Sequence, residues 1–547
     1  MNHESSSVTT ELDRYPLSVK ETKEWLGNLP KTDSEKCIDI MLSGLRTLAE
    51  SKLDIAKRLK ILNCYHAPVS FAIGEVRNHR AILSLPLSQK ALSNTAKIAQ
   101  IYGLLADQYL QLAAPIVVYK GFSELPSKRQ LASACYWGIC YLSGILINSY
   151  ESYQRRPAGL WANMHRLYML ARGNNVLENK RVNGGTRTIA QLYKSALLLS
   201  LSDPYQLPLG IVDHLFELLD TWSASVHLRE SCQTTDGKCL FVIDLHCDDP
   251  GLPYFAHTKI DSSGGTIFLN TVPLVERLNV DLTQVLIEAA KEPSDLARSS
   301  KLEHMEMLRT LIVHWGTHPI RQLERKKIHQ KCDLVVGLKS VNFVVNNRKP
   351  YFEEQMFANF DATNEMMRGT FGYQQHRQKD DYICYHHWRY MDESRLGIHL
   401  ILEDTASVQV EVGDFVAVKS EQDQERWQPG IVRWAMSREG ADLELGIYKV
   451  GTDVKAAAVK RICSDEALNQ ELYTPALVLT GLQQTKQCHS VVAKSGIYEP
   501  NGMLWLNIQG EDHVVQASNL IKSTRSVDWF EFTYEYERSG IVHPSMG

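Results

Sequence analysis

The first two hundred or so residues carry a helical pattern of apolar positions. In the stretch 34–65 these positions recur at three- and four-residue spacing: Ile38, Met41, Leu42, Leu45, Leu48 and Leu53. That spacing places them on one face of a helix. Similar stretches follow at 95–113, 159–173 and 188–201, the last two being separated by a Gly- and Asn-rich loop. We therefore predict an all-α region over residues 1–230. No fixed period recurs along it, so a regular helical repeat is the less favoured arrangement.

The pattern of apolar and polar residues changes after residue 230. Short β-branched runs bounded by Gly and Asp, at 237–245 and 264–270, predict strands, and the stretches 273–292 and 301–316 return to a helical pattern. We expect residues 231–318 to form a mixed segment of strands and helices.

Beyond residue 318 the helical pattern stops. Strand-like segments bounded by Gly or Asp follow at 332–338, 397–403, 408–419, 427–436 and 442–450. Their spacing is that of a small antiparallel barrel. A polar, aromatic-rich insertion, residues 346–385, interrupts them. We predict a barrel domain over 319–465 and a further β module over 466–547. The predicted fold class is multidomain α+β: an all-α N-terminal region, a small antiparallel β-barrel and a C-terminal β module.

Composition narrows the class of protein. A chain of 547 residues is too long for one hydrophobic core, which favours several domains. The 59 Lys and Arg against 63 Asp and Glu give a net charge of -4, which argues against a protein that coats nucleic acid or an anionic membrane through bulk charge. Any site that binds an anion must then depend on a local group of basic residues. The 11 cysteines show no repeated spacing, as expected of reduced thiols rather than a disulfide framework.

The most apolar stretches, 112–119 and 133–150, are interrupted by Ser, Gly, Asn or Pro and fall short of the roughly 20 apolar residues that span a bilayer. We interpret them as buried helix and expect no transmembrane segment. The first residues lack the pattern of a secretory signal, so we expect a cytoplasmic protein.

Two sets of residues could bind a ligand. Arg321 and Arg325 stand four apart just before the first predicted barrel strand, and Asp392, Ser394 and Gly397 stand where a polar loop opens a later strand of the same barrel. An Arg guanidinium binds the O6 and N7 edge of guanine or a phosphate. A carboxylate accepts from the N1 and N2 donors of guanine, a hydroxyl binds a ring edge or phosphate, and Gly allows close approach of the backbone.

Each set also has an ordinary structural explanation. The arginines could pair with Glu324 or Glu303 and compensate the dipole of the preceding helix. Asp392 and Ser394 could form a turn into the strand, with Gly397 as a bulge. The order of the two sets around one predicted barrel favours a ligand.

An arginine pair followed by this Asp, Ser and Gly motif, together with Gly413-Asp414 and the run Gly430–Trp434, makes this part of the chain resemble the PilZ domain. The PilZ domain is the bacterial receptor module for cyclic di-GMP. The resemblance covers residues 319–462. It implies that Arg321 and Arg325 correspond to the family's flexible arginine arm, and that Asp392, Ser394 and Gly397 correspond to its guanine-binding strand motif. The whole layout, a long helical region before such a barrel, is similar to that of large bacterial PilZ proteins.

The leading interpretation is a cytoplasmic bacterial cyclic di-GMP receptor that is not an enzyme and carries no cofactor or functional metal. Ligand binding would change the helical region and its contacts with an unidentified protein partner; no nucleic acid polymer is expected as a partner. One alternative is a helical adaptor whose barrel has lost nucleotide binding. Another is a metal-assisted enzyme using Asp244, His246, Cys247, Asp248 and Asp249, whose spacing matches no standard ligand set. The adjacent histidines of 384–388 and the Gly-rich run 262–266 are poorer candidates for chemistry.

Overall fold

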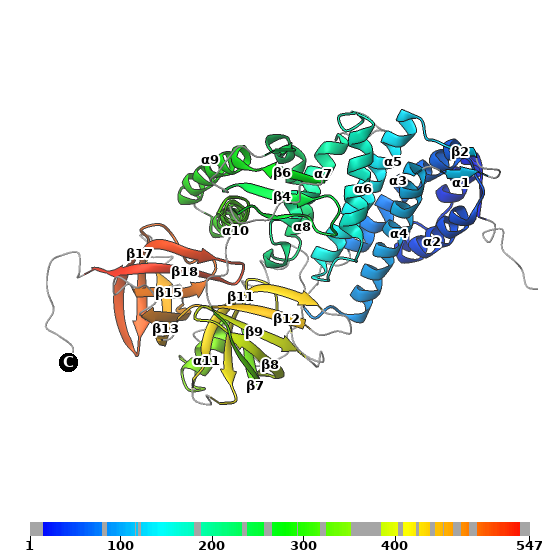
Figure 1. Ribbon diagram of the computed structural model, residues 1–547. Coiled ribbons are helices and arrows are strands. Elements are labelled where there is room, and N and C mark those ends of the chain that lie inside the picture. The colour runs from blue at the N-terminus through cyan, green and yellow to red at the C-terminus, as the bar shows by residue number, and fades with distance from the viewer. Residues whose placement is uncertain are drawn as a thin grey trace, which may run out of the picture. The chain divides into compact units, whose positions relative to one another are not determined.

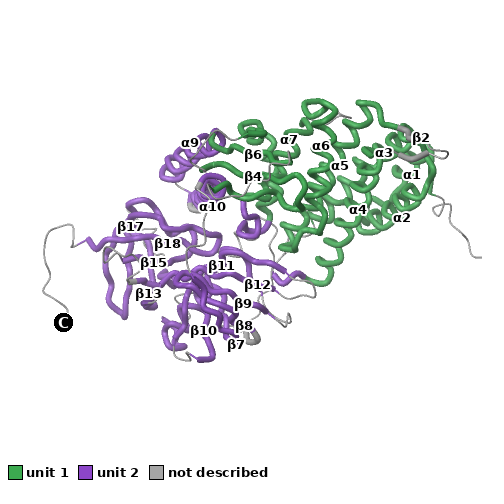
Figure 2. Tube along the Cα trace, in the orientation of Figure 1, with its two compact units in different colours: residues 1–81, 88–201, 210–272 green, residues 82–87, 202–209, 273–547 purple. Residues whose placement is uncertain are grey.

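The computed structural model describes residues 15–535 with gaps. The gaps are 79–84, 115, 119–121, 180–186, 232–237, 256–264, 293, 318–323, 352–383, 403–408, 423–425, 438–442, 452, 463–471 and 481–488. The chain forms two compact units (Figure 2). Unit 1 comprises residues 1–81, 88–201 and 210–272, and unit 2 comprises residues 82–87, 202–209 and 273–547.

Unit 1 is built mainly of helices, as predicted (Figure 1). They are α1 (Val19–Gly27), α2 (Ser34–Glu50), α3 (Ile55–Asn78), α4 (Gln89–Ala113), α5 (Lys128–Glu151), α6 (Leu160–Gly173), α7 (Ile189–Ser200) and α8 (Ile211–Trp222), with a short 3-10 turn, η3 (Ser223–Ser225), after α8 and a small hairpin of β1 (Ile116–Val118) and β2 (Phe122–Glu124) before α5. Local sequence sets the helix ends: Ser127 with Gln130 and Thr188 with Gln191 form capping boxes at α5 and α7.

The predicted apolar face of α2 is buried from Ile38 to Leu48. Leu53 departs from the prediction, because α2 ends at Glu50 and Leu53 lies in the connection to α3, where it is half-buried. Among the described residues, one helix, α5, has the length and composition to cross a membrane, and 78% of its most apolar stretch is buried inside the protein. The prediction of a buried helix at 133–150 is confirmed, whereas the same prediction for 112–119 is wrong, because α4 ends at Ala113 and strand β1 begins at Ile116.

A four-stranded antiparallel sheet completes unit 1. Its strands are β3 (His227–Arg229), β4 (Leu240–Asp244), β5 (Leu252–Pro253) and β6 (Thr266–Asn270), in the order β3-β6-β4-β5. β4 and β6 correspond to the two strands predicted from their β-branched residues. Asp248, after β4, accepts from the backbone N–H groups of Gly159, Trp161 and Ala162 at the start of α6. This distant side chain therefore caps the helix.

Unit 2 begins with two helices, α9 (Val272–Ala290) and α10 (Asp295–Ile312), followed by one π-helical turn, η4 (Val313–Thr317). The segment 202–209 contributes a 3-10 turn, η2 (Pro204–Gln206), which packs on strand β11. A six-stranded closed barrel follows, here called the first barrel (Figure 1). Its strands are β7 (Lys326–Val336), β8 (Cys384–Glu393), β9 (Gly397–Leu402), β10 (Phe415–Ser420), β11 (Gln428–Ser437) and β12 (Leu443–Lys449).

Strand β8 departs from the prediction, which places residues 384–393 in the insertion and a polar loop. The structure corrects this: β8 is paired with β7 on one side and with β9 on the other. Its inward side chains include Trp388 and Tyr390, both buried, and the exposed Arg389 separates them. The alternation is that of a half-buried strand, and Asp392 therefore lies in a strand.

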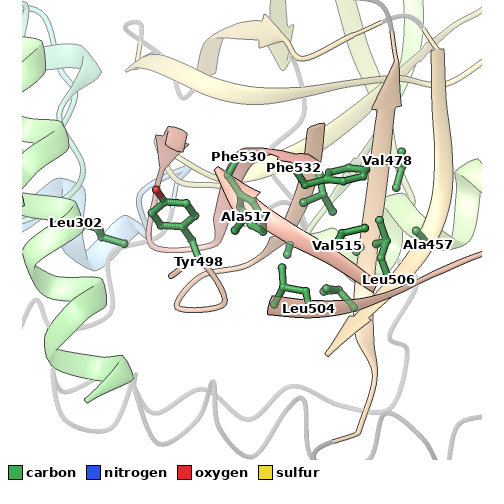
Figure 3. Packing of buried hydrophobic residues seen from close by; sticks show 14 of the residues in the cluster. Leu302, Ala457, Val478, Tyr498, Leu504, Leu506, Val515, Ala517, Phe530 and Phe532 are labelled. Carbon is green, nitrogen blue, oxygen red and sulfur yellow. The ribbon is translucent and has the colours of Figure 1, made fainter. Parts of the chain in front are cut away.

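The C-terminal module is a second closed barrel of six antiparallel strands. Its strands are β13 (Asp453–Arg461), β14 (Thr474–Thr480), β15 (His489–Lys494), β16 (Met503–Ile508), β17 (Glu511–Ser523) and β18 (Val527–Tyr534). The predicted division at 465/466 differs from the observed one, since β13 pairs with β14 and β16. Figure 3 shows part of the core: Val515 and Phe530 point inward, and Leu302 of α10 packs from outside the barrel.

The helix α11 (Leu338–Val345) follows β7 and connects the two barrels. Its apolar side chains share one core with residues from both barrels, including Phe415 of β10 and Trp529 of β18. The buried Asn342 amide donates to the carbonyl oxygens of Ala457 at 2.9 Å and Ala476 at 2.7 Å, on β13 and β14. Both N–H groups of the amide are thereby satisfied inside the protein.

Candidate functional site

The structure brings Arg325 and Asp392 into direct contact. Arg325 immediately precedes β7, whose first residues pair with the end of β8, so that Lys327 lies opposite Asp392. The Nη1 atom of Arg325 is 2.6 Å from Oδ1 of Asp392, and the two side chains are 38% and 21% exposed. Residues that are remote in sequence therefore meet at one end of the first barrel.

Ser394 and Gly397 form the tight turn between β8 and β9. The Ser394 backbone N–H donates to the Gly397 carbonyl at 2.8 Å, and the Gly397 N–H donates to Ser394 Oγ at 3.0 Å. A Cβ atom on Gly397 would meet Ser394 Oγ at 3.4 Å and the Ile447 carbonyl at 3.6 Å, which are ordinary contacts. The turn itself therefore does not demand glycine at position 397.

Positive charge is concentrated around this turn. Arg325, Lys326 and Lys327 are exposed at the start of β7, and Arg395 is exposed in the β8–β9 turn. Arg321 lies outside the described residues, as does most of the insertion 346–385. The described part of the site thus offers a carboxylate, a hydroxyl and several cations near one another, although the whole chain is slightly acidic. Such a surface favours an anionic ligand that also carries hydrogen-bond donors.

A row of side chains that sequence analysis did not identify extends from Asp392 across the barrel wall. His399 on β9 lies opposite Asp392 on one side and opposite Gly446 of β12 on the other, and Gly446 in turn lies opposite Trp434 of β11. The rings of His399 and Trp434 are 5.5 Å apart. The only sequence signal for His399 is a polar residue alternating with Ile398 and Leu400 along a strand.

Next to this row, Glu393 is held by two hydrogen bonds. Lys449 Nζ lies 2.8 Å and the Tyr390 hydroxyl 2.9 Å from its Oε2 atom. Burial raises the pKa of Glu393, but the bonds from Lys449 and Tyr390 outweigh burial and the pKa is lowered. Burial and the bond to Glu393 raise the pKa of Tyr390. This arrangement keeps the carboxylate beside Asp392 ionised and engaged.

The acidic cluster that could have held a metal serves local structure. Asp248 caps α6 and pairs with Arg156, and Asp244 accepts from the His246 N–H and from the Cys247 thiol. Among the described residues no group of three or more His, Cys, Asp or Glu is arranged to hold a metal ion. The side chains of Cys384–His387 and the run 262–264 lie outside the described residues.

Three family models match successive parts of the chain. Residues 20–233 match a model described as the N-terminal domain of the cyclic-di-GMP receptor FimW, residues 240–379 its middle PilZ domain, and residues 460–535 the FimW C-terminal beta-barrel domain. The middle match includes Arg321 and Arg325 and ends before Asp392. The likeness of Asp392, Ser394 and Gly397 to a PilZ motif therefore depends on their sequence and geometry.

A curated relative covers nearly the whole chain. The cyclic-di-GMP receptor FimW of Pseudomonas aeruginosa is 23% identical over 562 residues, an alignment that spans 94% of this chain and 90% of the relative. No solved structure matches this chain.

Proposed function

This chain belongs to the PilZ-domain proteins in which a long helical region precedes the PilZ barrel and a second barrel follows it, and we propose that it is a cytoplasmic bacterial receptor for cyclic di-GMP. The observation that carries the proposal is the contact between Arg325 and Asp392 beside the turn made by Ser394 and Gly397. It supports a single binding surface made of the arginine arm and the strand motif.

Each group has a chemical role in this proposal. Arg321 and Arg325 bind a guanine edge or a phosphate oxygen of the dianion, since guanidinium groups match both geometries. Asp392 accepts from the N1 and N2 donors of guanine, the Ser394 hydroxyl binds a ring edge or phosphate, and Gly397 leaves room for the ligand beside the backbone. No residue is assigned a role in breaking a bond, so the protein acts by binding.

Binding requires the Arg325–Asp392 pair to separate. An ion pair this exposed contributes less than about 1 kcal/mol to stability, because water and salt screen it. A ligand that gives Arg325 a phosphate or guanine edge and gives Asp392 two donors replaces the pair with more hydrogen bonds. The free pair therefore keeps both groups near their binding positions at small cost.

The output we propose is a change in the helical region and in its contacts with a protein partner. The segments 82–87 and 202–209 interrupt the helical region in sequence, yet they belong to unit 2, where Leu85 forms a β-bridge with Val410 and Gln206 accepts from Arg433. These segments therefore link, along the chain, the barrel that we propose binds the ligand and the helical region. A ligand shifts such an equilibrium only by the difference between its affinities for the two arrangements.

Calorimetric titration with cyclic di-GMP, beside GTP and cyclic di-AMP, tests the proposal. We expect selective binding of cyclic di-GMP, with the affinity reduced about ten- to a hundredfold in R325A and in D392A, since each loses charge-assisted hydrogen bonds. K23A, which removes an exposed cation from α1 in unit 1, serves as the matched control and keeps the wild-type affinity. A folded wild-type protein that binds none of the three nucleotides would instead identify a helical adaptor.

A further inference from the structure

His399 lies beside Asp392 on the neighbouring strand, between two carboxylates. Its Nδ1 atom is 3.2 Å from Asp392 Oδ2, and its Nε2 atom is 3.3 Å from Glu444 Oε2. The His399 side chain is 16% exposed and that of Glu444 is 8% exposed. The Nδ1 contact is a hydrogen bond, whereas Nε2 is buried without a hydrogen-bond partner among the described residues, so the bond to Asp392 and burial define the orientation of the ring.

Packing fixes the same ring from the side. The Trp434 indole lies over Gly446, where a Cβ atom would be 1.8 Å from Trp434 Nε1. Because Gly446 has no side chain, the indole can cross its strand and contact His399, at a ring separation of 5.5 Å. The hydrogen bond to Asp392 and an aromatic neighbour thus hold the histidine in one position.

The two oxygens of Asp392 have different partners. Oδ1 contacts Arg325 and Oδ2 contacts His399. A carboxylate can only accept, so the His399 Nδ1 atom carries the proton in this contact. When Arg325 leaves Oδ1, the bond from His399 still fixes the plane and direction of the carboxylate. The acceptor is then oriented before the ligand arrives, which lowers the cost of ordering it on binding.

We propose that His399 is a positioning residue for ligand recognition: held in place by its packing against Trp434, it orients the Asp392 carboxylate toward the ligand's guanine donors. This role rests on the proposed function, because it concerns the same cyclic di-GMP site. His399 itself acts through Asp392 and makes no contact with the ligand.

The test compares affinities for cyclic di-GMP in the full-length protein. H399L removes the donor while preserving bulk, and we expect an affinity about tenfold lower with the thermal midpoint changed little. H399N places an amide donor where Nδ1 was and should recover most of the affinity, whereas H399Q places its donor near Nε2 and should recover little. H489L, the same change at a histidine of the second barrel, is the matched control and should bind as the wild type does.

The outcomes separate this inference from the function on which it rests. If the wild-type protein does not bind cyclic di-GMP, the proposed function fails. If the wild type binds and H399L binds within twofold of it, or H399Q recovers more affinity than H399N, the positioning role is overturned while the receptor assignment stands. Should H399L not fold, the order of H399N and H399Q decides.

Discussion

Arg325 Nη1 lies 2.6 Å from Asp392 Oδ1. In the free protein, these two residues that we propose bind the ligand therefore contact each other. The two residues are 67 positions apart in the chain, with β7, α11 and the insertion between them, and strand pairing between β7 and β8 brings them together. Ligand binding then replaces the ion pair between these residues with contacts to the ligand. A substitution here should therefore change the affinity for the ligand more than the free energy of unfolding.

The first prediction separates binding from stability at this pair. R325A should lower the free energy of unfolding by less than about 1 kcal/mol, because the pair is exposed. The stabilisation that cyclic di-GMP gives at a fixed concentration should nevertheless be smaller than in the wild type, by up to about 1.4 to 2.7 kcal/mol for an affinity reduced ten- to a hundredfold. Urea unfolding with and without the nucleotide measures both. A large loss of stability in R325A without ligand would show that the pair serves mainly the fold.

A second prediction concerns the space above Gly446. In G446A the new Cβ would overlap the Trp434 indole, which must move, and overpacking of this kind costs about 1–3 kcal/mol. We expect a lower unfolding free energy, a shifted tryptophan emission maximum and weaker binding of cyclic di-GMP. The control is G103A in α4, where a Cβ meets nothing within 4 Å. Equal behaviour of the two variants would contradict the packing described here.

Asn342 provides the third prediction. N342A leaves the Ala457 and Ala476 carbonyl oxygens without their buried donor, and each such loss costs roughly 1–3 kcal/mol. Chemical denaturation should show a loss of stability of a few kcal/mol. S340A, on the same helix α11, should cost less, because a hydroxyl donates at most one hydrogen bond and alanine retains the small volume of the residue. Similar losses in the two variants would argue against the double hydrogen bond.

The fourth prediction uses the buried Asp528 of β18. Burial raises its pKa from the ordinary 3.8 to about 6, although Ser523, Tyr498 and Gly496 donate hydrogen bonds to it. The folded state therefore binds the proton more tightly, so this residue's contribution to stability grows as the pH falls from about 6 to 4 and is lost as the pH rises again. The full effect corresponds to about 3 kcal/mol.

Asparagine at this position can keep these contacts without titrating. We expect the difference in unfolding free energy between wild type and D528N to change between pH 7 and pH 4.5 in favour of the wild type. Urea midpoints across this range measure it. A difference independent of pH would mean that Asp528 keeps its ordinary pKa in the folded protein.

Much of the architecture could be predicted because periodicity is a local property. The apolar face of α2 and the β-branched runs of β4 and β6 each follow from a few neighbouring residues. Strand β8 was missed because its polar residues become a strand only through pairing on both sides. The second barrel was predicted only as a β module, since β15 and the pairing of β13 depend on partners far along the chain.

In the site, too, the residue types could be predicted from the sequence and their arrangement in space could not. Arg325, Asp392, Ser394 and Gly397 stand out as residue types suited to a nucleotide, and their proximity is a product of the barrel. Sequence gives no sign that His399, Trp434 and Glu444 act together, because their importance comes from lying across three strands. A histidine between two carboxylates can be recognised only in the folded chain.

The common core that α11 makes between the two barrels has a practical consequence for fragments of this protein. A cut between Val450 and Asp453 would leave Phe415 and Val341 facing water on one piece and Leu477 and Trp529 on the other. Exposed apolar surface of this kind promotes aggregation. Expression of the first barrel by itself should therefore yield insoluble material, and the smallest usable truncation retains residues through the last strand, β18.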